Sequence, residues 1–72
     1  MSHVVSAELV ANVLSVEVVA GQQVQATDPV VVLESMKMET PIDAPVAGTV
    51  AWVGCAAKDQ VERHQPLFTI ES

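Results

Sequence analysis

The sequence predicts an all-β fold, a flattened barrel or sandwich built from two similar halves, and three observations support it. Valine, which is stiff at χ1 and favours strands, is abundant in a chain that is 50% hydrophobic. No segment shows a sustained helical periodicity of apolar residues. The run from Pro29 to Ser35 resembles the run from Pro66 to Ser72, at an offset of 66 − 29 = 37. The 72 residues are expected to form a single domain, 1–72, with a loose N-terminus of about residues 1–5.

The repeat extends to the first part of each half. Val10-Ala11-Asn12 resembles Val46-Ala47-Gly48 at an offset of 46 − 10 = 36, so the second half should contain one extra residue near Ala57-Lys58. Asn12 and Gly48 tolerate positive φ, which favours equivalent tight turns at these positions. A repeated unit of this size cannot cover its own apolar face. Two copies related by a pseudo-twofold axis are therefore expected to pack against each other.

Short apolar runs separated by turn signals such as Asp28-Pro29 and Gln65-Pro66 predict eight short strands. These are Val4–Leu9, Val13–Val18, Gln23–Val24, Val30–Glu34, Met38–Asp43, Gly48–Val53, Gln60–Val61 and Leu67–Glu71. Period-2 alternation predicts which side chains face inward. The predicted core comprises Leu14, Val16, Val31, Leu33, Val50, Trp52, Phe68 and Ile70.

The hexapeptide from Glu34 to Glu39, Glu-Ser-Met-Lys-Met-Glu, lies between two strand-like runs and predicts a β-hairpin with Lys37 at its tip. Met36 and Lys37 suit a two-residue type I′ loop poorly, because both central residues need positive φ, a strain of about 1–3 kcal/mol. The same register places Glu34 opposite Glu39, and like charges across a ladder destabilise it. These costs indicate that something other than stability selected the hexapeptide. The termini should lie at the opposite end of the molecule.

The Met-Lys-Met sequence with flanking glutamates resembles the attachment site of biotinyl domains, the biotin carboxyl carrier family. The resemblance runs from about Ser6 to Ser72, and includes the stretch Thr40–Val50. It is nearest to the small stand-alone biotinylated proteins of actinobacteria. It implies the barrel-sandwich hybrid fold shared by biotinyl and lipoyl domains, and covalent biotin on Lys37. The implied recognition motif around the lysine consists of Glu34, Ser35, Met36, Met38 and Glu39.

Several positions depart from the family pattern. Thr27 and His64 stand where the family commonly has glycine, and Lys58-Asp59 stands where Gly-Asp is frequent. These turns are therefore expected to be strained or of a different type. Nothing is inserted between Val18 and Val30, so the protruding thumb of some bacterial carriers should be absent. We expect Met36 to be exposed beside the lysine, and Met38 to pack partly over the end of the barrel.

The resemblance implies a post-translationally modified carrier. Biotin protein ligase would attach biotin, and biotin carboxylase and carboxyltransferase subunits would act on it in trans. The chain offers no acid–base or nucleophilic constellation of its own, so we expect a carboxylase subunit and not an enzyme. A lipoyl-type acyl carrier is an alternative with the same fold, although lipoyl sites usually place Asp before the lysine. A small unmodified interaction or storage protein is a third possibility.

Composition excludes several other classes. The net charge is −6, with Lys37, Lys58 and Arg63 as the only cations, so we expect no nucleic-acid partner. No signal peptide or long apolar run is visible, so no membrane association is expected. The single Cys55 cannot form an internal disulfide, which favours the cytoplasm. One cysteine and two isolated histidines give no metal-ligand spacing, so no metal is expected.

Overall fold

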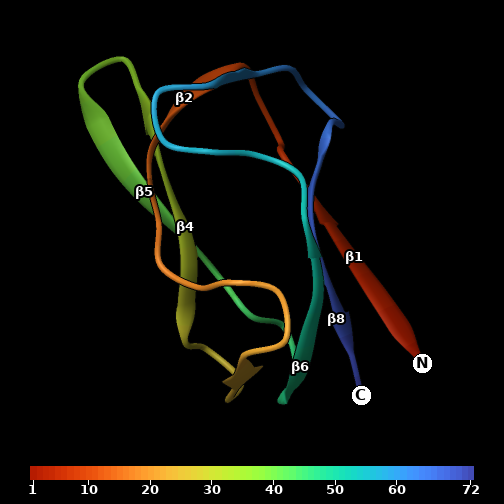
Figure 1. Ribbon diagram of the computed structural model, residues 1–72. Coiled ribbons are helices and arrows are strands. Elements are labelled where there is room, and N and C mark those ends of the chain that lie inside the picture. The colour runs from red at the N-terminus through yellow and green to blue at the C-terminus, as the bar shows by residue number, and fades with distance from the viewer.

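The computed structural model describes residues 1–72 and contains eight strands in two four-stranded antiparallel sheets (Figure 1). The strands are β1 (Ser2–Ser6), β2 (Ala11–Val16), β3 (Gln23–Val24), β4 (Pro29–Ser35), β5 (Met38–Asp43), β6 (Gly48–Val53), β7 (Gln60–Val61) and β8 (Pro66–Glu71). One sheet has the order β1-β8-β6-β3 and the other β5-β4-β2-β7. The all-β prediction is confirmed. The structure contains no helix with the length and apolar character needed to cross a bilayer.

The two sheets are pseudo-twofold copies of each other, with β1, β8, β6 and β3 corresponding to β5, β4, β2 and β7. A single offset relates the halves, since β2 and β6 begin 48 − 11 = 37 residues apart and β3 and β7 begin 60 − 23 = 37 apart. The predicted change of offset near Ala57 is therefore wrong, and Ala11 is the counterpart of Gly48. Neither Asn12 nor Gly48 has positive φ, because both lie in strands. Gly48 is needed for space, since a Cβ there would collide with the backbone carbonyl of Glu71.

The N-terminal residues, expected to be loose, form an edge strand instead. β1 pairs with β8 from Ser2 opposite Glu71 to Ser6 opposite Pro66. The α-amino group of Met1 donates a hydrogen bond to the carbonyl of Ser72 at 2.7 Å. β1 also ends at Ser6 and not at Leu9. The N-terminal residues are ordered because their backbone groups form hydrogen bonds with an edge of β8 that would otherwise be unpaired.

Fourteen buried side chains fill the space between the sheets, and most occupy equivalent positions of the two halves. The core comprises Ala7, Ala11, Val13, Val18, Val24, Val30, Val31, Leu33, Ala44, Val50, Val61, Leu67, Phe68 and Ile70. The predicted core residues Val31, Leu33, Val50, Phe68 and Ile70 are confirmed, and Val16 packs partly buried against them.

Leu14 and Trp52 were predicted wrongly as core residues, since they are 39% and 47% exposed. β-Bulges explain both errors. The β2–β4 register shifts between Val13 and Ser15, and the β6–β8 register shifts between Val50 and Trp52. Each bulge adds one residue and so reverses the alternation of faces beyond it. The mistaken offset of 36 made Leu14 the counterpart of Val50, whereas the true counterpart is Val13.

Four tight turns connect the short strands, and the third residue of each has positive φ. In each turn the amide of the fourth residue donates to the carbonyl of the first, as from Asp28 to Gln25 at 3.1 Å. This geometry favours glycine at the third position. One turn has Gly21 there, whereas the others have Thr27 (φ 72°), Lys58 (φ 76°) and His64 (φ 70°). The expected strain at these departures from the family pattern is confirmed.

Replacing Thr27 by glycine should stabilise the fold. A β-branched residue in the left-handed region lowers the free energy of unfolding by roughly 1–2 kcal/mol. Glycine removes this strain, but it makes the unfolded chain more flexible, which lowers the free energy of unfolding by roughly 0.5–1 kcal/mol. Thr27→Gly should therefore raise the free energy of unfolding by about 0.5–1 kcal/mol in a denaturant melt. Ala26→Gly, one residue earlier and without positive φ, is the matched control and should lower it. Equal effects of the two changes would contradict the strain argument.

Replacing Leu33 by alanine should destabilise the protein by about 2–5 kcal/mol, because it leaves a cavity between the sheets. Leu14→Ala removes the same atoms from an exposed bulge, and its effect should stay within about 0.5 kcal/mol. Urea melts of both variants measure the difference. Similar losses for the two leucines would refute the placement of Leu14 outside the core.

Candidate functional site: the β4–β5 hairpin

A two-residue turn joins β4 to β5 and carries Lys37 at its tip. Ser35 pairs with Met38 and Glu34 with Glu39, which is the predicted register. Met36 and Lys37 both have positive φ, of 54° and 66°, the signature of a type I′ turn. This turn matches the right-handed twist of the flanking strands, so the backbone beneath the lysine is well defined.

The tip presents a primary amine between two apolar side chains. Lys37 is exposed, and no other group of the protein hydrogen-bonds its amine. Met36 is 92% exposed, as expected. Met38 is 69% exposed and packs less over the barrel end than expected, because its strand extends past the core. A free amine on an ordered turn suits attachment of a group through an amide bond. No existing contact of the amine has to be broken, and the fold does not have to rearrange.

The outer face of the hairpin is acidic. Glu39 pairs with Glu34, which pairs in turn with Asn12 on β2, and Asn12 pairs with Gln60 on β7. The result is a continuous polar row across the sheet that contains two carboxylates and no cation. Like-charged cross-strand neighbours destabilise a ladder, so this row offers no stability reason for Glu34 and Glu39.

The opposite end of the molecule holds the chain termini, as predicted (Figure 1). The uniform offset makes Ser72 the counterpart of Ser35 (72 − 35 = 37) and Met1 the counterpart of Met38 (38 − 1 = 37). The terminal residues are paired by backbone hydrogen bonds in both directions, at 2.7 and 3.0 Å. The two terminal residues thus lie side by side at the position that corresponds to the base of the hairpin turn.

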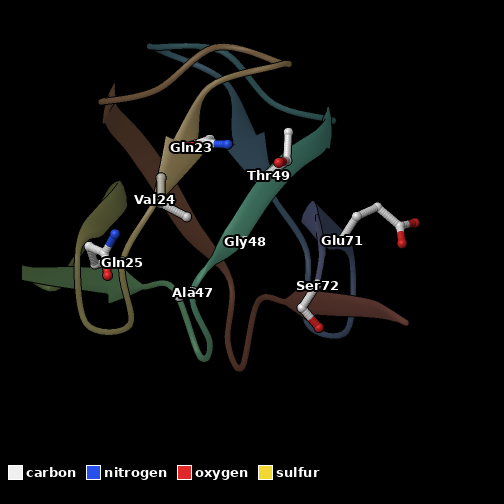
Figure 2. Close-up of a pocket in the computed structure, with 8 residues that line it drawn as sticks. All are labelled: Gln23, Val24, Gln25, Ala47, Gly48, Thr49, Glu71 and Ser72. Atoms are coloured by element: carbon white, nitrogen blue, oxygen red, sulfur yellow. The ribbon is translucent and has the colours of Figure 1, made fainter.

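A shallow pocket near the termini shows what this second end can offer (Figure 2). Its lining is mainly polar, from Gln23, Val24, Gln25, Ala47, Gly48, Thr49, Glu71 and Ser72. The Glu71 side chain points away from Gly48, and the Ser2 hydroxyl donates to its carboxylate. The lining contains no lysine, arginine, histidine or cysteine, so this pocket provides no attachment amine.

The remaining reactive side chains are separated from one another. His3 Nε2 lies 3.0 Å from Ser72 Oγ, and no group of three His, Cys, Asp or Glu side chains could hold a metal ion. Burial raises the pKa of the Cys55 thiol, and the negative charge of Asp59 raises it further. The thiolate is the nucleophilic form of cysteine, so this environment makes Cys55 a poor nucleophile.

A pocket beside the hairpin was not anticipated from the sequence. It is lined by Glu8, Leu9, Ala11, Leu33, Ser35, Thr40 and Ile42. Its far wall belongs to the loop between β1 and β2, which the sequence pattern predicts as strand as far as Leu9. No sequence signal marks this wall, because Ala7, Glu8 and Leu9 continue the alternation of apolar and polar residues that is typical of a strand.

Comparisons of sequence place these features in a family. Residues 3–70 match the family model described as "Biotin-requiring enzyme". The chain is 47% identical over 70 residues to the biotinylated protein TB7.3 homolog of Mycobacterium leprae, covering 97% of this chain and 99% of that protein. It is also 36% identical over 70 residues to pyruvate carboxylase of Staphylococcus aureus, where it spans 97% of this chain and 6% of the carboxylase.

Comparisons of structure agree. The urea carboxylase of Kluyveromyces lactis contains a region that superposes with a TM-score of 0.90 at 24% identity, covering 99% of this chain and 6% of that one, which supports the fold alone. A single-chain, multi-domain long-chain acyl-CoA carboxylase superposes with a TM-score of 0.88 at 29% identity, over 94% of this chain and 7% of that one. Small parts of large carboxylases thus share this fold.

Proposed function

Because the chain belongs to the biotin-requiring enzyme family, we propose that it is a biotin carboxyl carrier with biotin attached covalently to Lys37. The observation that carries this proposal is the exposed amine of Lys37 between Met36 and Met38 on a type I′ turn. Biotin supplies a ureido nitrogen that accepts and releases a carboxyl group, and this chemistry belongs to the cofactor. The protein supplies the tether and the surface that partner enzymes recognise.

Attachment requires the Lys37 amine to act as a nucleophile in the active site of a biotin protein ligase. The amine nitrogen attacks the activated carboxyl carbon of biotin, here an adenylate. The amide C–N bond forms as the bond to the adenylate oxygen breaks, and the amine loses a proton. The ordered turn favours this encounter, because little backbone freedom is lost when the ligase binds the tip.

The carrier step requires the tip to visit two active sites, a biotin carboxylase and a carboxyltransferase, both in trans. Tethering raises the effective concentration of the cofactor at each site. The lysine stands at the end of a hairpin that projects beyond the core, so the tip enters a cleft before the body of the domain collides (Figure 1). The net charge of −6 favours partners with basic surfaces around those clefts.

Lys37 should be the sole site of biotinylation. Lys37→Arg keeps the charge and the exposure but removes the acceptor amine, so modification by biotin protein ligase should be lost while the melting curve is unchanged. Lys58→Arg, at the other lysine, is the matched control and should be modified fully. Intact mass and peptide mapping report the site, and biotin on Lys58 would disprove the assignment.

Met36→Asp tests whether the methionines serve recognition. The change moves the tip toward the lipoyl-type pattern while Asp tolerates the positive φ of this position, so stability should stay within about 0.5 kcal/mol. The rate of biotinylation should fall roughly tenfold or more, the equivalent of about 1.4 kcal/mol of lost contact. Val19→Asp adds the same charge at another exposed aliphatic position and should leave the rate unchanged. Early melting of the Met36 variant would show instead that Met36 is a packing residue.

A further inference from the structure

The hairpin has an inner face that extends beyond the core and covers a pocket. Leu33 and Ser35 on β4 lie on the same side as Thr40 and Ile42 on β5, because alternate residues share a face and Leu33 pairs with Thr40. Glu8 and Leu9, from the loop between β1 and β2, form the opposite wall. The enclosed volume is about 110 Å³, and this pocket is the most enclosed of the four on the surface.

The pocket occurs only in the half of the molecule that carries the lysine. At the offset of 37, Glu8 corresponds to Pro45 and Thr40 to His3. The Glu8 carboxylate therefore has no counterpart, although Ser35 corresponds to Ser72, and no pocket of the structure is lined by the whole equivalent set. The frame is symmetric, so a feature present at one end alone comes from the side chains placed there and not from the fold.

The pocket lies within reach of a group attached to Lys37. Three residues of extended strand separate Lys37 from Thr40, a distance of roughly 10 Å at about 3.4 Å per residue. A lysine side chain extended by the acid arm of biotin contains about eleven single bonds and spans roughly 12 Å or more. The ring of an attached biotin can therefore fold back along the inner face of the hairpin.

The lining matches the chemistry of the biotin ring. We propose that biotin on Lys37 rests with its bicyclic ring in the pocket formed by Leu9, Leu33, Ser35, Thr40, Ile42 and Glu8. The sulfur-containing ring is apolar and suits the leucine and isoleucine side chains. The ureido group has two N–H donors and one carbonyl acceptor, which the Glu8 carboxylate and the Ser35 and Thr40 hydroxyls complement. This inference rests on the proposed attachment of biotin to Lys37.

Such a resting site sets the fraction of the time in which the biotin ring is free to bind a partner enzyme. A short tether gives an effective concentration in the mM range, so a pocket with only mM affinity for the ring is occupied about half of the time. Partner enzymes bind the undocked form, and their apparent affinity falls in proportion to the docked fraction. The pocket therefore acts as a weak intramolecular competitor of the carboxylase, the transferase and any other biotin-binding protein.

Nuclear magnetic resonance of the chain with and without biotin tests the docking. In the biotinylated protein, the methyl groups of Leu9, Leu33 and Ile42 should shift and show nuclear Overhauser contacts with the ring protons. Leu9→Asp, at a position 54% exposed, places a charge in the apolar wall and should abolish these contacts. Val19→Asp is the matched control and should retain them. Thr40→Gln, which fills the pocket with a longer side chain, is a second blocking variant.

The rate at which avidin captures the biotinylated protein is a second, independent measure of docking. Avidin takes the undocked ring, so capture should be about twofold faster for Leu9→Asp than for the wild type if the ring is docked half of the time. The docking proposal fails if mass spectrometry finds biotin on Lys37 while the chemical-shift changes stay within residues 35–39 and the ring contacts are absent. That outcome leaves the carrier function intact. Ring contacts that persist in both blocking variants overturn it as well. A protein that the ligase leaves unmodified on Lys37 overturns both proposals.

Discussion

Burial of one half of the chain against the other is the constraint on which this structure depends. Each half supplies short strands with one apolar face, and neither face can be covered within its own half. The equivalent residues Val13 and Val50, and likewise Leu33 and Ile70, meet in one core at the pseudo-twofold interface. A domain of this size buries only about 60% of its unfolded surface, so few of these contacts are dispensable. The hairpin, the strained turns and the paired termini are all held in place by this core.

The proposed attachment site lies where the pseudo-twofold symmetry between the two halves is broken. The tight turn with Met36 and Lys37 at one end corresponds to a gap between the chain ends at the other. The strain in this turn has a different meaning from the strain at Thr27, Lys58 and His64. Those residues take positive φ in ordinary connecting turns, and nothing in the structure requires their side chains there. At the hairpin tip, the strained residues are the ones that the proposed attachment needs.

The fold class, the register of the hairpin and the position of the termini could be predicted from the sequence, because they follow from local signals and from the repeat. The inward or outward orientation of Leu14 and Trp52 could not, since each bulge adds a single residue and no turn residue marks it in the sequence. The order of the N-terminal strand depends on partners 60 or more residues away, from Ser6 opposite Pro66 to Ser2 opposite Glu71. The pocket at Leu9 was missed for the same reason, because its walls come from segments that are distant in the sequence.

The hairpin has two chemically different faces, and the proposed roles divide between them. Its outer face carries Glu34 and Glu39 in a polar row, where a partner protein can interact with the carboxylates without contacting the core. Its inner face carries Leu33, Thr40 and Ile42, which line the small pocket proposed to hold the biotin ring. Strand alternation separates the two faces by a single residue step, so recognition and docking need not compete for the same side chains. The type I′ turn defines the backbone at the tip, so in the proposed carrier the motion between partner sites falls to the lysine side chain and the arm that it would bear.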